Sequence, residues 1–372
     1  MVPDPSGGTE SFDCSADESA GVLSNVLANE LNSWYKSQQH KRNVERGKPY
    51  FNGPSPVPDP RRHSPSQLLK CHRRVYYQLH NAPAEKGEPT GIFWFGSRFE
   101  TEVAVPFLQS LTRDGEYIRN SMWVDFTVDS TDQSIRIRGE TDSVFVDADS
   151  EPLLLTEIKT TTSLSNLEAP KPQHLAQVHA YLYGLSEQFE RRLSDAVILY
   201  AKRDDFSTRV FHVQFEQEFW EDRVLTWASQ NSEYRRSQSL PPPTPEFEWE
   251  CDYCPYRRRC GRAGSQFSDE DVTGLLPFTD DYPRAQLENY LEAYPDAKLT
   301  PTLALRYPEL AEEWGTYDWQ CPACSSSYSF ESVDWDGDLE QLPYCKPCAE
   351  SGLLATLEEP KPDVQPATRR EE

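Results

Sequence analysis

The sequence has no long apolar run, and no stretch approaches the roughly twenty apolar residues that a membrane-spanning helix needs. Its opening residues, MVPDPSGGTE, lack the basic and apolar regions of a secretory signal peptide. The GxxxxGK[ST] motif of nucleotide-driven motors is also missing. These absences argue against a membrane protein and against a helicase motor in this chain, and they predict a soluble, cytoplasmic protein.

Positive charge is scarce. The chain has 37 Lys and Arg residues against 61 Asp and Glu residues, a net charge of -24 at pH 7, and arginine clearly outnumbers lysine. This composition is typical of proteins from salt-loving archaea, although an ordinary acidic cytosolic protein can share it. It argues against nonspecific DNA binding by the whole surface. It allows a local basic groove, because the Debye length in molar salt is about 3 Å, and in such salt base stacking matters more than phosphate contacts.

Helical and alternating patterns follow one another along the middle of the chain, and its 372 residues suffice for one large domain plus a small one. Helices are expected over residues 18–46, 67–79, 91–111, 173–185 and 216–236, and strands over residues 122–128, 134–146, 153–160, 196–202 and 208–215. This order of helices and strands predicts an α/β fold with a mixed central sheet flanked by helices.

Charged residues concentrate in the stretch from Gly139 to Tyr181. Glu157 and Lys159 are two apart on an expected strand, so they point to the same side. If the preceding strand pairs as a neighbour, Asp142 brings a second carboxylate to the same place, where a divalent cation would make the like charges tolerable. A lone ExK triplet is usually a solvated strand end. The full set of Asp142, Glu157, Lys159 and the helix that follows is much less expected by chance.

Eight of the nine cysteines fall into spaced groups, which in a reducing compartment favours metal sites over disulfides. The segment CDYCPYRRRC supplies Cys251, Cys254 and Cys260, three thiolates that suit a soft cation. Cys71 is the remaining cysteine within the structured region that could act as a fourth ligand, whereas Cys14 stands alone near the N-terminus.

The other four cysteines form a CPAC and a CKPC pair, a strong zinc-ribbon signal. They are Cys321, Cys324, Cys345 and Cys348. The ribbon could be a structural cap or could contact DNA or protein, and the sequence leaves both readings open.

Taken together, the motifs resemble the iron-sulfur subclass of RecB-like nucleases in the PD-(D/E)XK superfamily, with the CRISPR-associated exonuclease branch as the closest match. The matching stretches span about Ser64 to Gly261. The resemblance implies a restriction-endonuclease-like core in which a four-iron four-sulfur cluster, held by the four cysteines Cys71, Cys251, Cys254 and Cys260, clamps the two ends of the domain.

The resemblance also implies that Asp142 and Glu157 bind the catalytic magnesium or manganese and that Lys159 orients the attacking water. Gln177 and Tyr181 would form the helical motif beside the site. The sequence departs from the family at Glu100, where a histidine is usual; its carboxylate can still bind a hard cation.

Six segments are therefore expected. They are a disordered tail (1–16), an N-terminal helix and linker (17–63), the nuclease domain with its iron-sulfur clamp (64–262), a helical connector (263–318), the zinc ribbon (319–356) and a second disordered tail (357–372).

The predicted activity is that of a metal-dependent DNA exonuclease acting on single-stranded ends. The pathway that the resemblance implies is CRISPR adaptation, beside integrase proteins. One alternative is the nuclease subunit of a repair or recombination complex whose helicase is a separate chain. Another is a noncatalytic module that binds DNA ends. The intact set of Asp142, Glu157 and Lys159 argues against that module, and Glu100 is its best support.

Overall fold

The computed structural model describes residues 34–35, 37–38, 41–42, 44–45, 54–87, 89–130, 133–263 and 273–366. The chain divides into two units, Met1–Gly53 and Pro54–Glu372. The expected N-terminal tail, Cys14 and most of the expected helix over residues 18–46 lie outside the described residues. The second unit contains every other element considered below.

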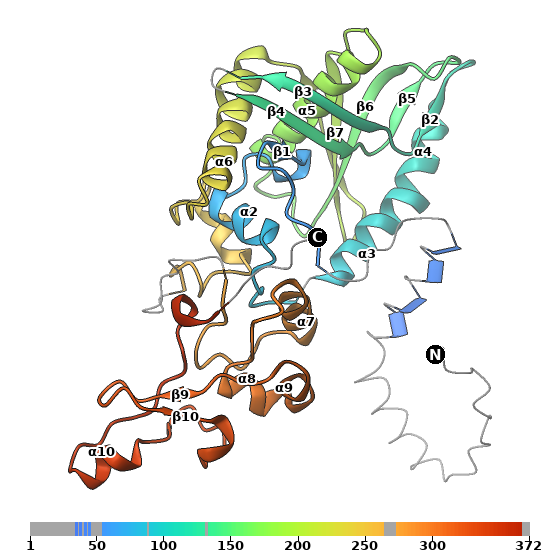
Figure 1. Ribbon diagram of the computed structural model, residues 1–372. Helices are drawn as coiled ribbons and strands as arrows, with labels where there is room; N and C mark the ends of the chain where they lie inside the picture. The colour runs from blue at the N-terminus through green and yellow to red at the C-terminus, as the bar shows by residue number, and fades with distance from the viewer. Residues whose placement is uncertain are drawn as a thin grey trace, which may run out of the picture. The chain divides into compact units, whose positions relative to one another are not determined.

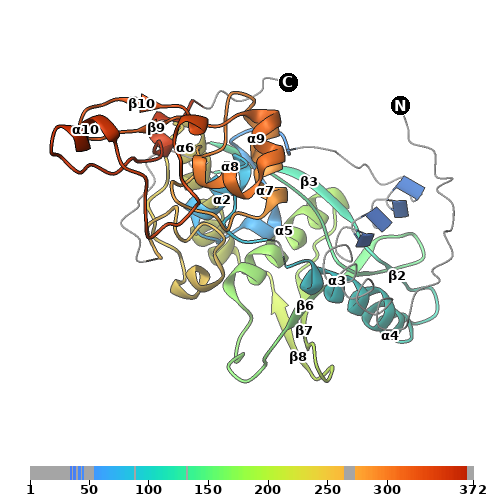
Figure 2. The same cartoon turned by 90° about the horizontal axis from the view of Figure 1, so that it is seen from below.

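A five-stranded mixed sheet forms the centre of the second unit, with the strand order β2-β5-β6-β7-β8. Its strands are β2 (Tyr117–Arg119), β5 (Val144–Val146), β6 (Pro152–Thr161), β7 (Asp195–Lys202) and β8 (Thr208–Gln214). The neighbours β6 and β7 are parallel, and the other pairs are antiparallel. Helix α5 (Pro172–Gln188) is the crossover that a parallel pair requires. Figure 1 shows β5, β6 and β7 in the sheet, and Figure 2 shows β6, β7 and β8 side by side. The predicted α/β fold with a mixed sheet is confirmed.

A second sheet has the order β1-β4-β3, with β1 (Arg62–His63), β3 (Trp123–Asp129) and β4 (Ser134–Glu140). The single strand expected over residues 134–146 is wrong, because β4 and β5 belong to different sheets. Thr141 turns the chain between them: its backbone and hydroxyl both bond to the backbone of Met122, and the hydroxyl also bonds to the carbonyl of Asp142. Asp142 thus lies in a short link between two sheets.

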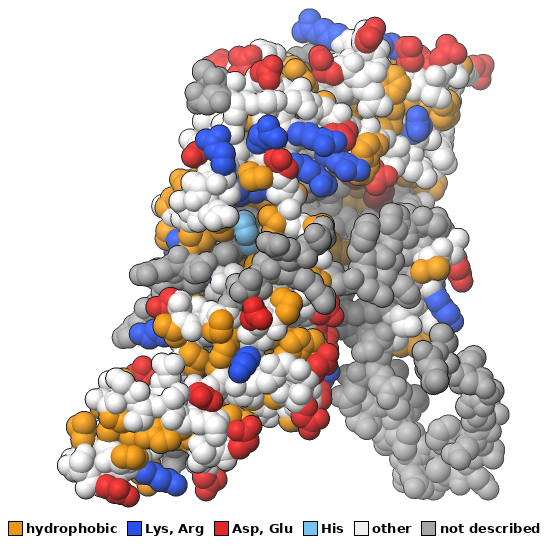
Figure 3. Space-filling view, in the orientation of Figure 1, with side chains coloured by type: hydrophobic (Ala, Val, Ile, Leu, Met, Phe, Trp, Pro, Cys, Tyr) orange, Lys and Arg blue, Asp and Glu red, His pale blue; other side chains and the backbone are white. Residues whose placement is uncertain are grey.

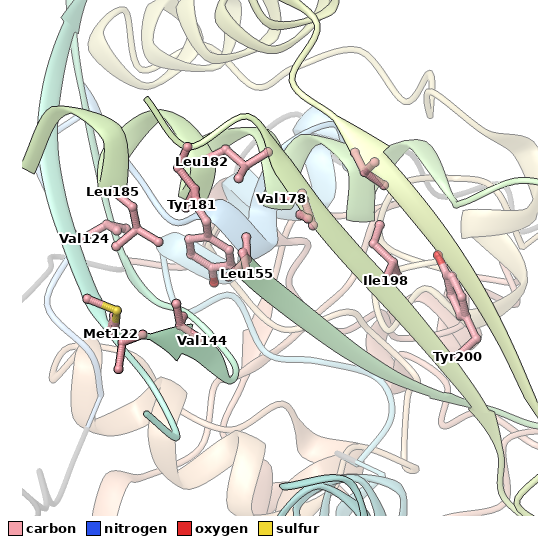
Figure 4. Close-up of a cluster of buried hydrophobic side chains, with 14 of the residues drawn as sticks. Met122, Val124, Val144, Leu155, Val178, Tyr181, Leu182, Leu185, Ile198 and Tyr200 are labelled. Carbon is pink, nitrogen blue, oxygen red and sulfur yellow. The ribbon is translucent and has the colours of Figure 1, made fainter. Parts of the chain in front are cut away.

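Helix α5 packs against both sheets. Figure 4 shows Val178 and Leu182 of α5 in one buried cluster with Leu155 of β6, Ile198 of β7 and Val124 of β3. Each of these five side chains is fully buried. Because Gln177 and Tyr181 belong to this sandwiched helix, the core fixes their positions.

Other helices cover the second face of the five-stranded sheet and part of the inner face of the smaller sheet. The continuous helical segment α3 (Thr90–Phe99), η2 (Glu100–Ala104) and α4 (Val105–Gln109) lies on the other face of the five-stranded sheet, where Phe99 and Ala104 pack on Ile158. Helices η3 (Phe219–Leu225) and α6 (Thr226–Arg236) pack with Ile135 and Ile137 of the smaller sheet. Further elements before the sheets are η1 (Pro65–Gln67) and α2 (His72–Leu79).

The C-terminal part has a core of its own. It contains η4 (Glu248–Tyr253), α7 (Arg284–Ala293), α8 (Pro301–Arg306), α9 (Pro308–Trp314), β9 (Trp319–Gln320), β10 (Ser327–Tyr328), η5 (Phe330–Ser332), α10 (Lys346–Glu350) and η6 (Pro362–Val364). The expected helical connector is indeed helical, and buried Leu287, Tyr290 and Leu303 hold its helices together.

The chain from Leu357 to Pro366 differs from the expected disordered tail, because it is packed. The buried carboxylate of Glu359 accepts hydrogen bonds from the backbone of Phe278 and Thr302. The Gln365 side chain pairs with both backbone groups of Leu275, at 2.7 Å each. These side chains satisfy backbone groups that no regular element would pair, which fixes the segment.

Candidate active site and metal centres

Three of the predicted site residues meet on or beside β6, the central strand of the five-stranded sheet. Asp142 Oδ2 accepts a hydrogen bond of 2.8 Å from the backbone N–H of Ile158, the residue between Glu157 and Lys159. The side chain of Lys159 forms an ion pair with the fully buried carboxylate of Glu157. The link between the sheets therefore delivers Asp142 to the strand that carries the other two groups.

Glu100 is the third carboxylate beside this place. It is the first residue of η2, a π-helical turn inside the α3–α4 segment, and such turns are frequent at functional sites. Burial raises the pKa of Glu100 to about 7, and the negative charge of Asp142 adds to the rise. The charge of Asp142 thus acts on Glu100, the position at which the sequence departs from the histidine usual in the family.

The site holds more negative than positive charge. Burial raises the pKa of Glu157 to about 7 and also raises that of Asp142. Burial alone would lower the pKa of Lys159, but attraction to Glu157 and Asp142 raises it, so the lysine is charged. Glu157 Oε2 is buried and has no hydrogen-bond partner within the described part of the chain. One ammonium group facing three carboxylates fits a site for a hard divalent cation.

Gln177 and Tyr181 face the same region from α5, one helical turn apart. Gln177 Nε2 donates to the Tyr181 hydroxyl at 3.2 Å, and that hydroxyl donates to the backbone carbonyl of Glu140 at 2.7 Å. Both side chains are buried. They brace the end of β4, two residues before Asp142, so their contacts are with the scaffold of the site.

Two nearby residues were not predicted. Glu140 lies close enough for its charge to raise the pKa of Asp142 and of Glu100. Burial, followed by the charges of Arg74 and Lys159, lowers the pKa of Lys70 to about 8. The spacing of Glu140 and Asp142 offered a sequence signal, whereas nothing near Lys70 in the sequence indicates its proximity to Lys159.

The four cysteines of the first group line a single pocket with about 340 Å³ of empty space, part of it open to solvent. Cys251 belongs to η4, and Cys254 and Cys260 follow it. Cys71 was expected inside a helix but precedes α2 as its N-cap, in a non-helical conformation with φ -48° and ψ 120°. Burial raises the pKa of all four thiols, that of Cys254 to about 12.

Arginines share the pocket wall. Arg73, Arg74 and Arg262 line it, and Arg73 Nη1 and Arg74 Nε are buried without a hydrogen-bond partner in the residues that the structure describes. Arg73 also donates through Nε to the carbonyl of Pro241, but unpaired buried donors on charged groups are costly, so an anionic group in the pocket would stabilise them. Four thiol donors around a space flanked by arginines fit an iron-sulfur cluster, because thiolate ligation makes such a cluster anionic.

A buried carboxylate connects this pocket to helix α5. Glu250 Oε2 accepts from the backbone N–H of Cys71 at 2.8 Å, and Glu250 Oε1 accepts from Gln173 Nε2 at 2.5 Å. Gln173 lies one turn before Gln177 on the same helix. The thiol pocket and the carboxylate site therefore share one supporting helix.

The second cysteine group is compact. The sulfurs of Cys321, Cys324, Cys345 and Cys348 all lie within 4.8 Å of one another. Two of the separations are 3.8 Å, Cys321 to Cys348, and 3.7 Å, Cys324 to Cys345. Zinc-sulfur bonds of about 2.3 Å in a tetrahedron place the sulfurs about 3.8 Å apart. The group therefore fits a single tetrahedral zinc ion.

Several basic and aromatic residues around the thiol pocket have structural contacts. Arg259 is fully buried and donates to the backbone carbonyl of Gly274, and Arg258 pairs with Asp281 at 2.5 Å. Tyr76 and Tyr77 are buried in a cluster beside the thiol pocket. None of the helices described in the structure combines the length and apolar character that crossing a lipid bilayer requires.

The family model described as "PD-(D/E)XK nuclease superfamily" matches residues 40–261, more than half of the chain. The chain belongs to the PD-(D/E)XK nuclease superfamily. Nucleases of this superfamily use divalent metal ions, in keeping with the carboxylate site. A solved structure described as "Crystal structure of SSO0001" is 16% identical, with a TM-score of 0.41, over 61% of this chain and 96% of that one. The search of curated proteins found no match.

Proposed function

We propose that this PD-(D/E)XK protein is a magnesium- or manganese-dependent deoxyribonuclease that acts as an exonuclease on single-stranded DNA ends. The observation that carries the proposal is the meeting of Asp142, Glu157 and Lys159 at the central strand β6, where the carboxylates outnumber the single ammonium group. A noncatalytic DNA-binding module would have no need for the half-buried lysine beside the two carboxylates.

Asp142 and Glu157 would hold the divalent ion, and Glu100 is placed to contribute a third carboxylate oxygen. When bound, the ion lowers the pKa of a water molecule and neutralises charge on the scissile phosphate. Lys159 donates a hydrogen bond to the attacking water, and its pKa keeps it charged at neutral pH. Gln177 and Tyr181 hold the backbone before Asp142 in place.

The thiol pocket supports a structural iron-sulfur cluster on Cys71, Cys251, Cys254 and Cys260. The cluster would tie the start of the nuclease domain to its end. The C-terminal thiols support a zinc ribbon on Cys321, Cys324, Cys345 and Cys348 that caps the chain or contacts a partner.

The order of these motifs supports membership in the RecB-like, CRISPR-associated branch, and the acidic composition supports a halophilic host. A role in CRISPR adaptation beside integrase proteins follows from that membership. Work beside a separate helicase in DNA repair is the competing pathway, and the identity of the copurifying protein distinguishes the two.

The test uses protein purified without oxygen, end-labelled linear single strands and manganese. Asp142→Ala should lose both metal binding and cleavage. Lys159→Ala should bind manganese with cleavage reduced at least about a hundredfold, the size of a general acid-base or electrostatic contribution. Glu102→Gln, which removes an exposed carboxylate two residues from Glu100, is the matched control and should cleave normally.

Two outcomes contradict the proposal. Cleavage by Asp142→Ala at the wild-type rate would remove the assigned metal site. Cleavage of circular single strands as fast as linear ones would rule out an exonuclease and leave an endonuclease.

A further inference from the structure

The outer face of the β1-β4-β3 sheet carries positive charge and an exposed indole on an otherwise acidic protein. Strand alternation buries Ile135 and Ile137 in the core and turns the arginines of β4 outward. Figure 3 shows Lys and Arg side chains gathered over β3 and β4. The residues of this outer-face cluster are Arg62, Trp123, Arg136 and Arg138.

The strand register brings these side chains together. Arg62 of β1 lies beside Arg136 of β4, and Arg138 lies opposite Asp125 of β3. The Arg138 guanidinium stands 4.8 Å from the centre of the Trp123 ring. Trp123 is 48% exposed, and the side chains of Arg136 and Arg138 are 53% and 39% exposed.

Two acidic side chains balance part of this charge. Asp125 accepts two hydrogen bonds from Arg136, at 2.7 and 2.6 Å, and lies 3.7 Å from Arg138. Glu140 shares this face two residues after Arg138. No ion pair involves Arg62 within the described residues. Three guanidinium groups against two carboxylates still leave the cluster with net positive charge, whereas the whole chain carries -24.

The cluster adjoins the carboxylate site. Trp123 pairs in register with Glu140, the last residue of β4. The backbone carbonyl of Glu140 accepts the hydrogen bond from the Tyr181 hydroxyl. From Arg138 the chain reaches Asp142 in four residues, a span of at most about 13 Å at 3.3 Å per residue. A strand of DNA that crosses the sheet face would therefore run directly to or from the carboxylates.

Resting on the proposed nuclease function, we propose that this face binds the single-stranded part of the DNA substrate. Trp123 stacks on an unpaired base, and Arg62, Arg136 and Arg138 contact phosphates. The combination of an aromatic platform with surrounding arginines is the pattern by which proteins hold single strands without reading sequence. Stacking on Trp123 retains its strength in high salt, where phosphate contacts weaken. Asp125 competes with the phosphates for Arg136 and limits the affinity.

The test measures binding of a fluorescein-labelled oligothymidylate in calcium, which permits binding without cleavage, over a series of salt concentrations. Trp123→Ala should weaken binding on the order of tenfold and leave the salt dependence unchanged, because stacking releases no counterions. Trp123→Phe should retain most of the affinity.

Charge variants should show the opposite signature. Arg62→Gln combined with Arg138→Gln should reduce the slope of log affinity against log salt by about 1.4, since each single-strand phosphate contact contributes about 0.7. Asp125→Asn should bind more tightly than the wild type, because it frees Arg136. Arg284→Gln, an exposed arginine of α7 that also pairs with carboxylates, is the matched control and should bind normally.

The outcomes separate this inference from the proposed function. A wild-type protein that binds and cleaves single strands, with equal affinity in all the cluster variants, would overturn the inference alone. A wild-type protein that binds no DNA would overturn both. Equal loss by Trp123→Ala on blunt duplex DNA would also overturn the inference, because paired bases cannot stack on the indole.

Discussion

The two cysteine groups of this protein use the same ligand atom in different ways. The C-terminal four sulfurs lie within 4.8 Å of one another and leave room for one ion. The four cysteines near the nuclease site line one pocket that is partly open to solvent and has arginines in its wall. In the proposed assignment, the compact group holds one zinc ion and the open, arginine-lined group holds the iron-sulfur cluster.

The groups also differ in what they connect. The C-terminal group lies within one short segment, residues 321–348, as the CPAC pair Cys321 and Cys324 and the CKPC pair Cys345 and Cys348. Cys71, in contrast, precedes all five strands of the central sheet, whereas Cys251, Cys254 and Cys260 follow them. Loss of the first group should affect one subregion, and loss of the second should affect the entire nuclease domain.

The largest effect is therefore expected from Cys254→Ser. A serine cannot replace a soft thiolate ligand, and ligation free energy is also folding free energy. The loss should be comparable with the domain's own stability, about 5–15 kcal/mol. Metal analysis and thermal unfolding of anaerobically purified protein test this. Iron should fall to near zero with zinc retained, and full iron content in the variant would show that Cys254 is not a ligand.

A smaller, local effect is expected from Cys345→Ser. Zinc should be lost while iron and cleavage remain, and faster amide exchange should be confined to residues 273–366. The cost should be a fraction of the about 10 kcal/mol that zinc contributes in isolated fingers, because Leu287, Tyr290 and Leu303 give this part an apolar core. Loss of cleavage together with zinc would mean that the zinc site and the carboxylate site are coupled, and the effect of the C-terminal cysteines would then not be local.

Glu250→Gln tests the connection between the thiol pocket and the carboxylate site. The amide keeps the shape of the side chain but places an NH₂ group against a donor, either Cys71 N–H or Gln173 Nε2. Loss of a buried hydrogen bond to a charged group costs about 1–3 kcal/mol.

Iron retention during dilution and the rate of cleavage should both fall in Glu250→Gln, since the carboxylate contacts both sides. Glu248→Gln is the matched control in the same loop. That carboxylate is 78% exposed and pairs with Arg262 at 3.3 Å, so its loss should cost little. A decrease in iron retention without any change in cleavage would show that α5 does not depend on the pocket.

Local patterns predicted the fold well because alternation and helical spacing are set by which side chains meet the core. The sequence could not show that β4 and β5 separate at Thr141, since the alternating pattern continues on both sides of the link. It also could not show that Glu359 and Gln365 order the C-terminal segment. A charged, proline-containing sequence has the same composition whether its polar side chains are solvated or bond to the backbone of a folded neighbour.

For the site, the residue types were visible and the supporting contacts were not. Glu157 and Lys159 could be grouped from strand alternation, whereas Asp142 was grouped with them by expecting a continuous paired strand and in fact lies in the link between the two sheets. Glu250 and Cys71, in contrast, form a hydrogen bond although they lie 179 residues apart in the sequence, and no local pattern predicts such a contact. Metal-site prediction from sequence thus found the candidate ligands and missed the residue that joins their pocket to α5.

The smallest effect is expected from Tyr328→Phe in the zinc site. The Tyr328 hydroxyl lies 3.0 Å from Cys345 Sγ, and a hydrogen bond to a thiolate reduces the charge that the metal must balance. Removing the hydroxyl should lower the free energy of unfolding by only about 0.5–1.5 kcal/mol, the net worth of one hydrogen bond. Zinc affinity should fall by about two- to tenfold, the equivalent of that free energy. Competition with a colorimetric chelator measures this directly. Tyr344→Phe, next to the same ligand and 53% exposed, is the control, and an equal loss there would show that the hydroxyl of Tyr328 has no special part in holding Cys345.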